Sequence, residues 1–177
     1  MNKNSVIIKP LDLSSLSGLS DLSDTSVLSA AAEVIRMSFA TVAKEFDITE
    51  QNFPNHTSFM TAEKLQNHFN WGWQMYGLYD GARLIGYVSL SKIFGDTFEL
   101  HNLAVLPEFR RNGYGRRLLD FCKAKVKESG GSKITLGMIE ENTVLKDWYT
   151  ANGFRHTGMK WFKNWPFTVG FMEWDEG

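Results

Sequence analysis

Three residues near the middle of the chain have the types and spacing of an anion-binding loop: Arg110, Gly113 and Gly115, in the pattern Arg-x-x-Gly-x-Gly. Glycines let a backbone approach a ligand closely, because they carry no Cβ. An apolar run precedes the pattern and an amphipathic segment follows it, so the loop is expected to open a helix. The first N–H groups of a helix are unpaired and its dipole favours an anion, to which arginines add forked donors. The predicted phosphate-binding loop comprises Arg110, Arg111, Asn112, Gly113, Tyr114, Gly115 and Arg116.

Two better-known phosphate loops fit this segment poorly. A P-loop is excluded because neither Gly113 nor Gly115 is followed by Lys and then Ser or Thr. A dinucleotide-binding fingerprint requires three spaced glycines and an acidic residue about 20 positions further on. Here the twenty-first residue after Gly115 is Leu136, inside an apolar run.

The loop and a second motif together resemble the GCN5-related N-acetyltransferase (GNAT) family. The first motif is Leu103-Ala104-Val105 followed by Arg110 to Gly115, and the second, at 148–154, has a tyrosine shortly before a Gly-Phe pair. The two motifs lie in the family's order and at family-like separations over about residues 97 to 154. Two correctly spaced motifs are more specific than either alone.

Hydrophobic periodicity and turn residues predict an α/β fold with a mixed, mostly antiparallel central sheet flanked by helices. The turn at Asp80-Gly81 favours a hairpin, and Gly130-Gly131 is expected to end the helix after the loop. The segment 11–24 has no clear assignment. The predicted order is β-α-α-β-β-β-α-β-α-β-β in one domain over 1–177, with strands at 6–8, 74–79, 83–94, 97–106, 133–139, 154–163 and 167–174 and helices at 25–46, 61–70, 114–129 and 143–151.

Composition is that of an ordinary globular protein, with 177 residues, 43% hydrophobic and 22% charged. A net charge of −1 gives no basic field for nucleic acid. No apolar run is long enough to span a membrane or to form a signal peptide. We therefore expect a cytoplasmic protein that binds neither nucleic acid nor membrane.

The resemblance implies acetyl-CoA as the cofactor, with its diphosphate in the predicted loop. In relatives the pantetheine arm runs beside the strand that ends here at Leu103, Ala104 and Val105, where this strand splays away from the next one, at 133–139. A backbone N–H near Val105 is then placed to stabilise the thioester oxyanion. In relatives the asparagine equivalent to Asn142 bonds the pantetheine arm, whereas the local sequence also suits a helix cap at this position.

Glu99 is the candidate general base. An alkylamine must lose a proton before it attacks, at a cost of roughly 4.6 kcal/mol at neutral pH. Strand alternation predicts that Glu99, His101, Leu103 and Val105 share one face, and family members that use a glutamate base carry it at this offset. Glu99 is equally well read as a solvated strand residue, and His101 is the reserve base or a substrate contact.

Tyr149 is the candidate general acid. By resemblance, the tyrosine before the Gly-Phe pair donates a proton to the departing thiolate, and a phenol is able to do so. Its other reading is a core aromatic residue on a short helix.

The cysteine and the spacing of the histidines give no sign of a nucleophile or a metal site. Cys122 is expected to be a buried, inert thiol, and the four histidines show no metal-ligand spacing, so no metal is assigned. Aromatic residues are unusually frequent in two segments that flank the acceptor side in this family. Most of them are read as structural, and some suit an acceptor pocket or a homodimer surface, which the sequence leaves open; they are Trp71, Trp73, Trp161, Trp165 and Phe167.

These observations predict an N-acetyltransferase that moves the acetyl group directly to a primary amine of a small molecule, in a ternary complex. An acetyltransferase of protein or peptide N-termini or lysines is the enzymatic alternative. The alternative from another class is a catalytically silent acyl-CoA-binding regulatory domain. The presence of both Glu99 and Tyr149 favours the enzyme.

Overall fold

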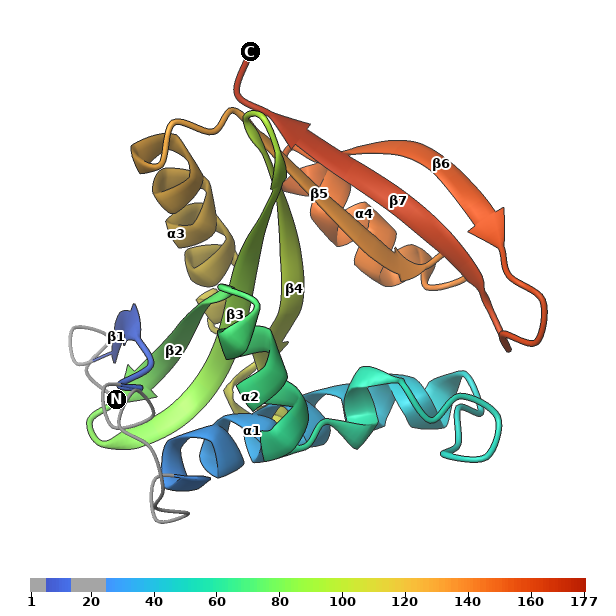
Figure 1. Cartoon of the computed structure of the whole chain (residues 1–177). Coiled ribbons are helices and arrows are strands. Elements are labelled where there is room, and N and C mark those ends of the chain that lie inside the picture. Colours follow the sequence, from blue (N-terminus) through green and yellow to red (C-terminus); the bar gives the residue numbers. More distant parts are fainter. Residues whose placement is uncertain (1–5, 14–24) are drawn as a thin grey trace.

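The computed structural model describes residues 6–13 and 25–177. It contains a seven-stranded sheet in the order β1-β2-β3-β4-β5-β7-β6 (Figure 1). All neighbouring strands are antiparallel except β4 and β5, which are parallel, so the predicted mixed, mostly antiparallel sheet is confirmed. The strands are β1 (Val6–Pro10), β2 (Gln74–Asp80), β3 (Arg83–Phe94), β4 (Thr97–Val105), β5 (Lys133–Ile139), β6 (Arg155–Trp161) and β7 (Thr168–Asp175).

Four α-helices flank the sheet: α1 (Thr25–Glu45), α2 (Ala62–Asn70), α3 (Tyr114–Glu128) and α4 (Thr143–Ala151). Helix α1 packs on β3 and β4, α3 packs on β3, β4 and β5, and α4 packs on β6. Thr61 caps α2 by accepting a hydrogen bond from the Lys64 N–H at 3.1 Å, as its sequence predicts. The segment 11–24 has no assignment from the sequence, and its residues 14–24 lie outside the described residues.

The apolar residues form two clusters. The larger one joins the inner faces of β2–β5 to α1 and α3 and contains Leu28, Ile35, Leu118 and Cys122. The smaller one links the end of α1 to β7 and contains Ala43, Ile48, Ile139, Phe167 and Val169. The smaller cluster therefore ties the two halves of the sheet together beside the opening described next.

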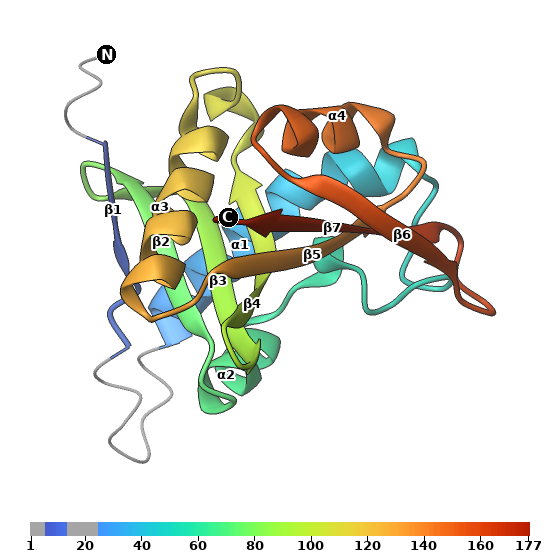
Figure 2. The same cartoon turned by 90° about the horizontal axis from the view of Figure 1, so that it is seen from above.

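Strands β4 and β5 separate after a short contact. They pair only at Thr97–Glu99 with Lys133–Thr135, although β4 continues to Val105 and β5 to Ile139. Figures 1 and 2 show β5, β7 and β6 running together away from β4. The facing edges of the two strands therefore carry backbone N–H and C=O groups beyond the last ladder pair.

A bulge in β4 corrects one sequence prediction. Ser89 pairs with His101 and Tyr87 with Ala104, so β4 has one residue more than β3 between these pairs, and Asn102 has a φ of 54°. Glu99 and His101 share a face, as expected. The extra residue moves Val105 onto the opposite face, because its partner is Gly86, so the predicted common face does not extend past Asn102.

Candidate active site

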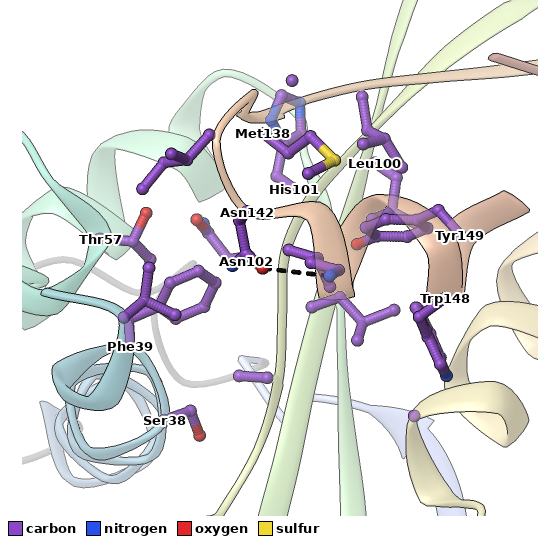
Figure 3. Close-up of a pocket in the computed structure, with 18 of the residues that line it drawn as sticks. Ser38, Phe39, Thr57, Leu100, His101, Asn102, Met138, Asn142, Trp148 and Tyr149 are labelled. Carbon is purple, nitrogen blue, oxygen red and sulfur yellow. Dashed lines mark hydrogen bonds between the residues drawn. The ribbon is translucent and has the colours of Figure 1, made fainter. Parts of the chain in front are cut away.

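A cleft of about 1020 Å³ occupies the opening between β4 and β5. Residues from α1, β4, β5 and α4 converge on it in Figure 3, including Phe39, His101, Met138 and Tyr149. The loop before α3 also lines the cleft. The structure thus brings both predicted catalytic residues, Glu99 and Tyr149, to one cavity. The predicted cofactor residues that line it are Leu103, Ala104, Val105, Arg110, Arg111, Gly113, Tyr114, Gly115, Arg116 and Asn142.

Helix α3 begins at this cleft without a side-chain cap. Its N-cap is Gly113, with a φ of 81°, a conformation that strains other residues. Arg111 before it also has a positive φ, of 62°. Asn112 holds the loop in shape by donating from Nδ2 to the carbonyls of Phe109 and Arg110, each at 3.1 Å. The first N–H groups of α3 therefore have no side-chain oxygen to bond at its N-cap.

Gly115 has a packing role as well as a backbone one. A Cβ at this position would lie 3.4 Å from the ring of Trp148, which also lines the cleft. A Cβ here would make an ordinary van der Waals contact with the wall formed by α4, so the space for a larger side chain is limited, whereas no atom would lie within 4 Å of a Cβ at Gly113. The two glycines are thus constrained for different reasons.

Arg110 is largely committed to holding the fold together. Its guanidinium donates to the Ser38 carbonyl at 2.5 Å, the Thr41 hydroxyl at 3.1 Å and the Val105 carbonyl at 3.2 Å. These bonds tie α1 to the end of β4. Arg111 and Arg116 also line the cleft and are exposed, and Nε of Arg116 lies 3.7 Å from Oδ2 of Asp120, one turn along α3.

Glu99 and His101 form a polar pair on one face of β4. The Oε2 atom of Glu99 lies 3.8 Å from Nε2 of His101, which is 2.9 Å from the Ser91 hydroxyl oxygen. Burial raises the pKa of the Glu99 carboxyl and lowers the pKa of His101 to about 4. The nearby charge of His68 lowers the pKa of His101 further. At neutral pH the imidazole is therefore uncharged.

The histidine belongs to a stack of rings that sequence reasoning missed. The indole of Trp73 stacks on His101 at a centroid distance of 3.8 Å and on His68 at 4.0 Å. Trp73 precedes β2 and His68 lies on α2, so residues far apart in the chain fix the orientation of His101. Their spacing carries no signal, because only the pairing of β2, β3 and β4 brings them together.

Tyr149 and Asn142 reach the cleft from α4. The Tyr149 hydroxyl points into the cavity in Figure 3, and burial raises the pKa of its phenol, which keeps it protonated. Trp148 and Phe154 hold the ring edge to face, at centroid distances of 4.9 and 5.4 Å. Asn142 caps α4 by accepting from the Leu145 N–H at 3.0 Å, so the capping reading holds while the residue also lines the cleft.

The remaining reactive groups lie apart from this chemistry. Cys122 is fully buried and its burial raises the pKa of the thiol, as expected of an inert residue. Within residues 6–13 and 25–177, no group of three or more His, Cys, Asp or Glu side chains could hold a metal ion. No helix of the described chain is both long and apolar enough to cross a bilayer.

The singled-out aromatic residues divide between two environments. Trp165 and Phe167 line the cleft and Trp73 stacks on His101. Trp71 and Trp161 are 68% and 64% exposed and do not line it.

Comparison with known proteins decides the family. The model of the acetyltransferase (GNAT) family matches residues 41–154, which is more than half of the chain and includes both predicted motifs. The chain belongs to the GNAT family.

Similar proteins agree with this assignment. An uncharacterized N-acetyltransferase of Bacillus licheniformis is 42% identical over 59 residues, which are 28% of this chain and 37% of that protein. The chain thus spans little more than a third of the curated relatives that it matches. The solved structure of PaiA N-acetyltransferase from Thermoplasma acidophilum with coenzyme A superposes with a TM-score of 0.72, 22% identity and coverage of 97% and 99% of the two chains. The structure of the ribosomal-protein-S18-alanine N-acetyltransferase from Escherichia coli superposes with a TM-score of 0.69 and 15% identity, and the match covers 97% of this chain and 94% of that one.

Proposed function

We propose that this GNAT protein is an acetyl-CoA-dependent N-acetyltransferase that transfers the acetyl group directly to a primary amine of a small molecule, in a ternary complex. One observation carries the proposal: a single cleft joins the uncapped start of α3 to Glu99 and Tyr149. An anion site, a candidate base and a candidate acid in one cavity are what acyl transfer to an amine requires.

The residues of the cleft fit coenzyme A. The N–H groups at the start of α3, with Arg111 and Arg116 beside them, suit a diphosphate. The open edges of β4 and β5 offer backbone donors and acceptors to the amides of the pantetheine arm. A backbone N–H near Val105 is the donor that we assign to the thioester oxygen.

When bound, acetyl-CoA supplies an activated acetyl thioester. Glu99 then accepts a proton from the amine, directly or through one water. A carboxyl whose pKa is raised by burial is a stronger base than an exposed one, whereas burial lowers the pKa of His101 to about 4 and so weakens it as a base. We therefore assign the base to Glu99.

Tyr149 supplies a proton to the leaving sulfur. Its buried phenol is protonated at neutral pH, and its hydroxyl points into the cavity (Figure 3). Direct transfer is supported by the one cysteine of the chain, because Cys122 is buried in the core and cannot carry an acyl group between substrates.

Thiol release from acetyl-CoA, measured with and without added amines, tests the proposal. Release that depends on a small primary amine is the expected result. Release with peptide N-termini or lysines alone would assign a protein acceptor. Coenzyme A binding without acceptor-dependent release would contradict the proposal and favour a silent acyl-CoA-binding domain.

A further inference from the structure

Aromatic side chains line the end of the cleft that lies away from α3. In Figures 1 and 2 the segment after α1 and the loop between β6 and β7 reach this end together. Phe53, from the first segment, contacts Trp165 and Phe167 of the loop at centroid distances of 4.5 and 5.1 Å. Phe162 packs on Trp165 at 4.8 Å. These four residues, which all line the cleft, are called the aromatic end below.

The aromatic end is already assembled, and it leaves ring surface accessible. Phe167 is buried in the smaller apolar cluster, with Phe53 and Phe162 packed against that cluster, whereas Trp165 is 37% exposed. The inner residues support the outer ring, and the outer ring faces the cavity. An apolar group of the substrate could pack on this preformed surface, and little binding free energy would be spent on reordering the protein side chains.

Negative charge is scarce in the same cleft. Of the described residues that line it, only Glu45 and Glu99 carry carboxylates, and Glu45 is exposed at the end of α1. His56, beside Phe53, is buried with its Nδ1 atom 2.8 Å from the Ser58 hydroxyl oxygen, and burial lowers its pKa to about 4. It is therefore neutral at pH 7 and neither attracts nor repels an amine.

The number of positive charges on an acceptor should determine how well it binds in this cleft. An amine with three or more positive charges needs a carboxylate or water for each of them, and burying an unpaired ammonium is costly. The cleft offers Glu99 near the reacting centre and aromatic carbon beyond it. A single ammonium attached to an apolar body matches that arrangement.

We infer that the acceptor is a primary amine with one positive charge joined to an aromatic or bulky apolar group, which packs on the aromatic end. The inference rests on the proposed function and narrows its substrate class. Polyamines, aminoglycosides and basic peptides are disfavoured by the same geometry.

Initial rates of thiol release with phenethylamine, n-hexylamine, spermidine and kanamycin test the inference. We expect kcat/KM for phenethylamine and n-hexylamine to exceed that for spermidine and kanamycin by about tenfold or more. Equal or higher values for the polycations would overturn the inference and leave the proposed function standing. No release with any amine, when calorimetry shows that acetyl-CoA binds, would overturn both.

Two matched tryptophan variants locate the binding surface. Trp165→Ala should raise KM for phenethylamine about tenfold with little change in kcat, and Trp165→Phe should restore most of the loss. Trp161→Ala removes an exposed tryptophan of the same hairpin that does not line the cleft, and should leave KM unchanged. Equal effects of Trp165→Ala and Trp161→Ala would contradict the inference. If Trp165→Ala does not fold, the amine series on the unaltered chain decides.

Discussion

Glu99 and Tyr149 lie in surroundings that favour their uncharged forms, and the consequence differs between them. For Glu99 a raised pKa makes the carboxylate a stronger base, whereas for Tyr149 it keeps the phenol protonated. Burial in one cleft raises the pKa of both groups, which makes Glu99 a stronger base and makes the Tyr149 phenol, already protonated at neutral pH, a weaker acid.

Replacing Tyr149 by Phe should lower kcat by about ten- to a hundredfold, because the leaving thiolate then lacks its proton donor. The phenyl ring keeps the packing against Trp148 and Phe154, so binding of coenzyme A should change little. Steady-state rates and calorimetry with coenzyme A make the measurement. Unchanged turnover would remove the acid role from Tyr149.

The Glu99 carboxylate should impose a pH dependence on the rate. Because its pKa is raised, the deprotonated form is lost as the pH falls through a value above that of an ordinary glutamate. The acidic limb of the kcat/KM profile should therefore lie above the pKa of an ordinary glutamate, and Glu99→Gln should flatten the limb and lower the rate by about a hundredfold. An identical profile in Glu99→Gln would refute the assignment.

Residue types and spacing predict some side chains of the site and not others. Glu99, Tyr149 and Gly113 follow from local sequence and family resemblance. The guanidinium bonds from Arg110 to α1 and the stacking of Trp73 on His101 depend on contacts between distant elements. No local pattern encodes such contacts, so they became visible only in three dimensions.

At the scale of elements, the site exists because two parallel strands part. Resemblance to the family predicted this splay, and the short β4–β5 register confirms it. The bulge at Asn102 was not predicted, although two successive polar residues, His101 and Asn102, interrupt the polar–apolar alternation of β4 at this point. A single extra residue decides which face of the sheet Val105 occupies.

We predict that coenzyme A binding is sensitive to a negative charge placed in the loop before α3. Gly113→Asp should abolish coenzyme A binding, because it places a carboxylate at the proposed diphosphate site. Gly81→Asp is a matched control: Gly81 also has a positive φ, of 59°, and open space around it, but lies in the β2–β3 turn. Calorimetry should show binding by the control alone, and normal binding by Gly113→Asp would reject the assignment.

Two neighbouring arginines are expected to differ. Arg110→Ala should lower the free energy of unfolding by about 1–3 kcal/mol, because three backbone or hydroxyl oxygens lose a charged donor. Arg111→Ala should leave stability unchanged and weaken coenzyme A binding in a salt-dependent way. Thermal unfolding and calorimetry separate the two effects. Equal stability of both variants would show that Arg110 does not tie α1 to β4.

At the scale of the whole molecule, apolar spacing and turn residues predicted each strand and α-helix of the described residues to within a few positions, but not the short 3-10 helices at Thr57–Phe59 and Pro107–Phe109. The predicted elements are long, have a regular spacing of apolar residues and are separated by clear turn residues. Their apolar residues are buried in the two apolar clusters. The joining of the sheet's halves by the smaller cluster could not be predicted, because its members come from α1 and the segment after it, from β5, and from β7 and the residue before it, and share no period.

Neutral buried histidines should make the fold sensitive to acid. The pKa values of His56 and His101 are about 4 in the folded chain and about 6.5 when unfolded. Between these values the unfolded chain binds more protons, so stability is full above pH 6.5 and declines as the pH falls toward 4. The melting temperature should fall over this window, and His56→Asn should make the decline shallower. The same slope in both chains would contradict this account.

Binding of acetyl-CoA to the intact chain tests the central claim most directly. Isothermal titration calorimetry should show one site per chain with a micromolar dissociation constant, because the start of α3 and the open edges of β4 and β5 are already formed. A folded sample that takes up no acetyl-CoA at millimolar concentration would contradict the account.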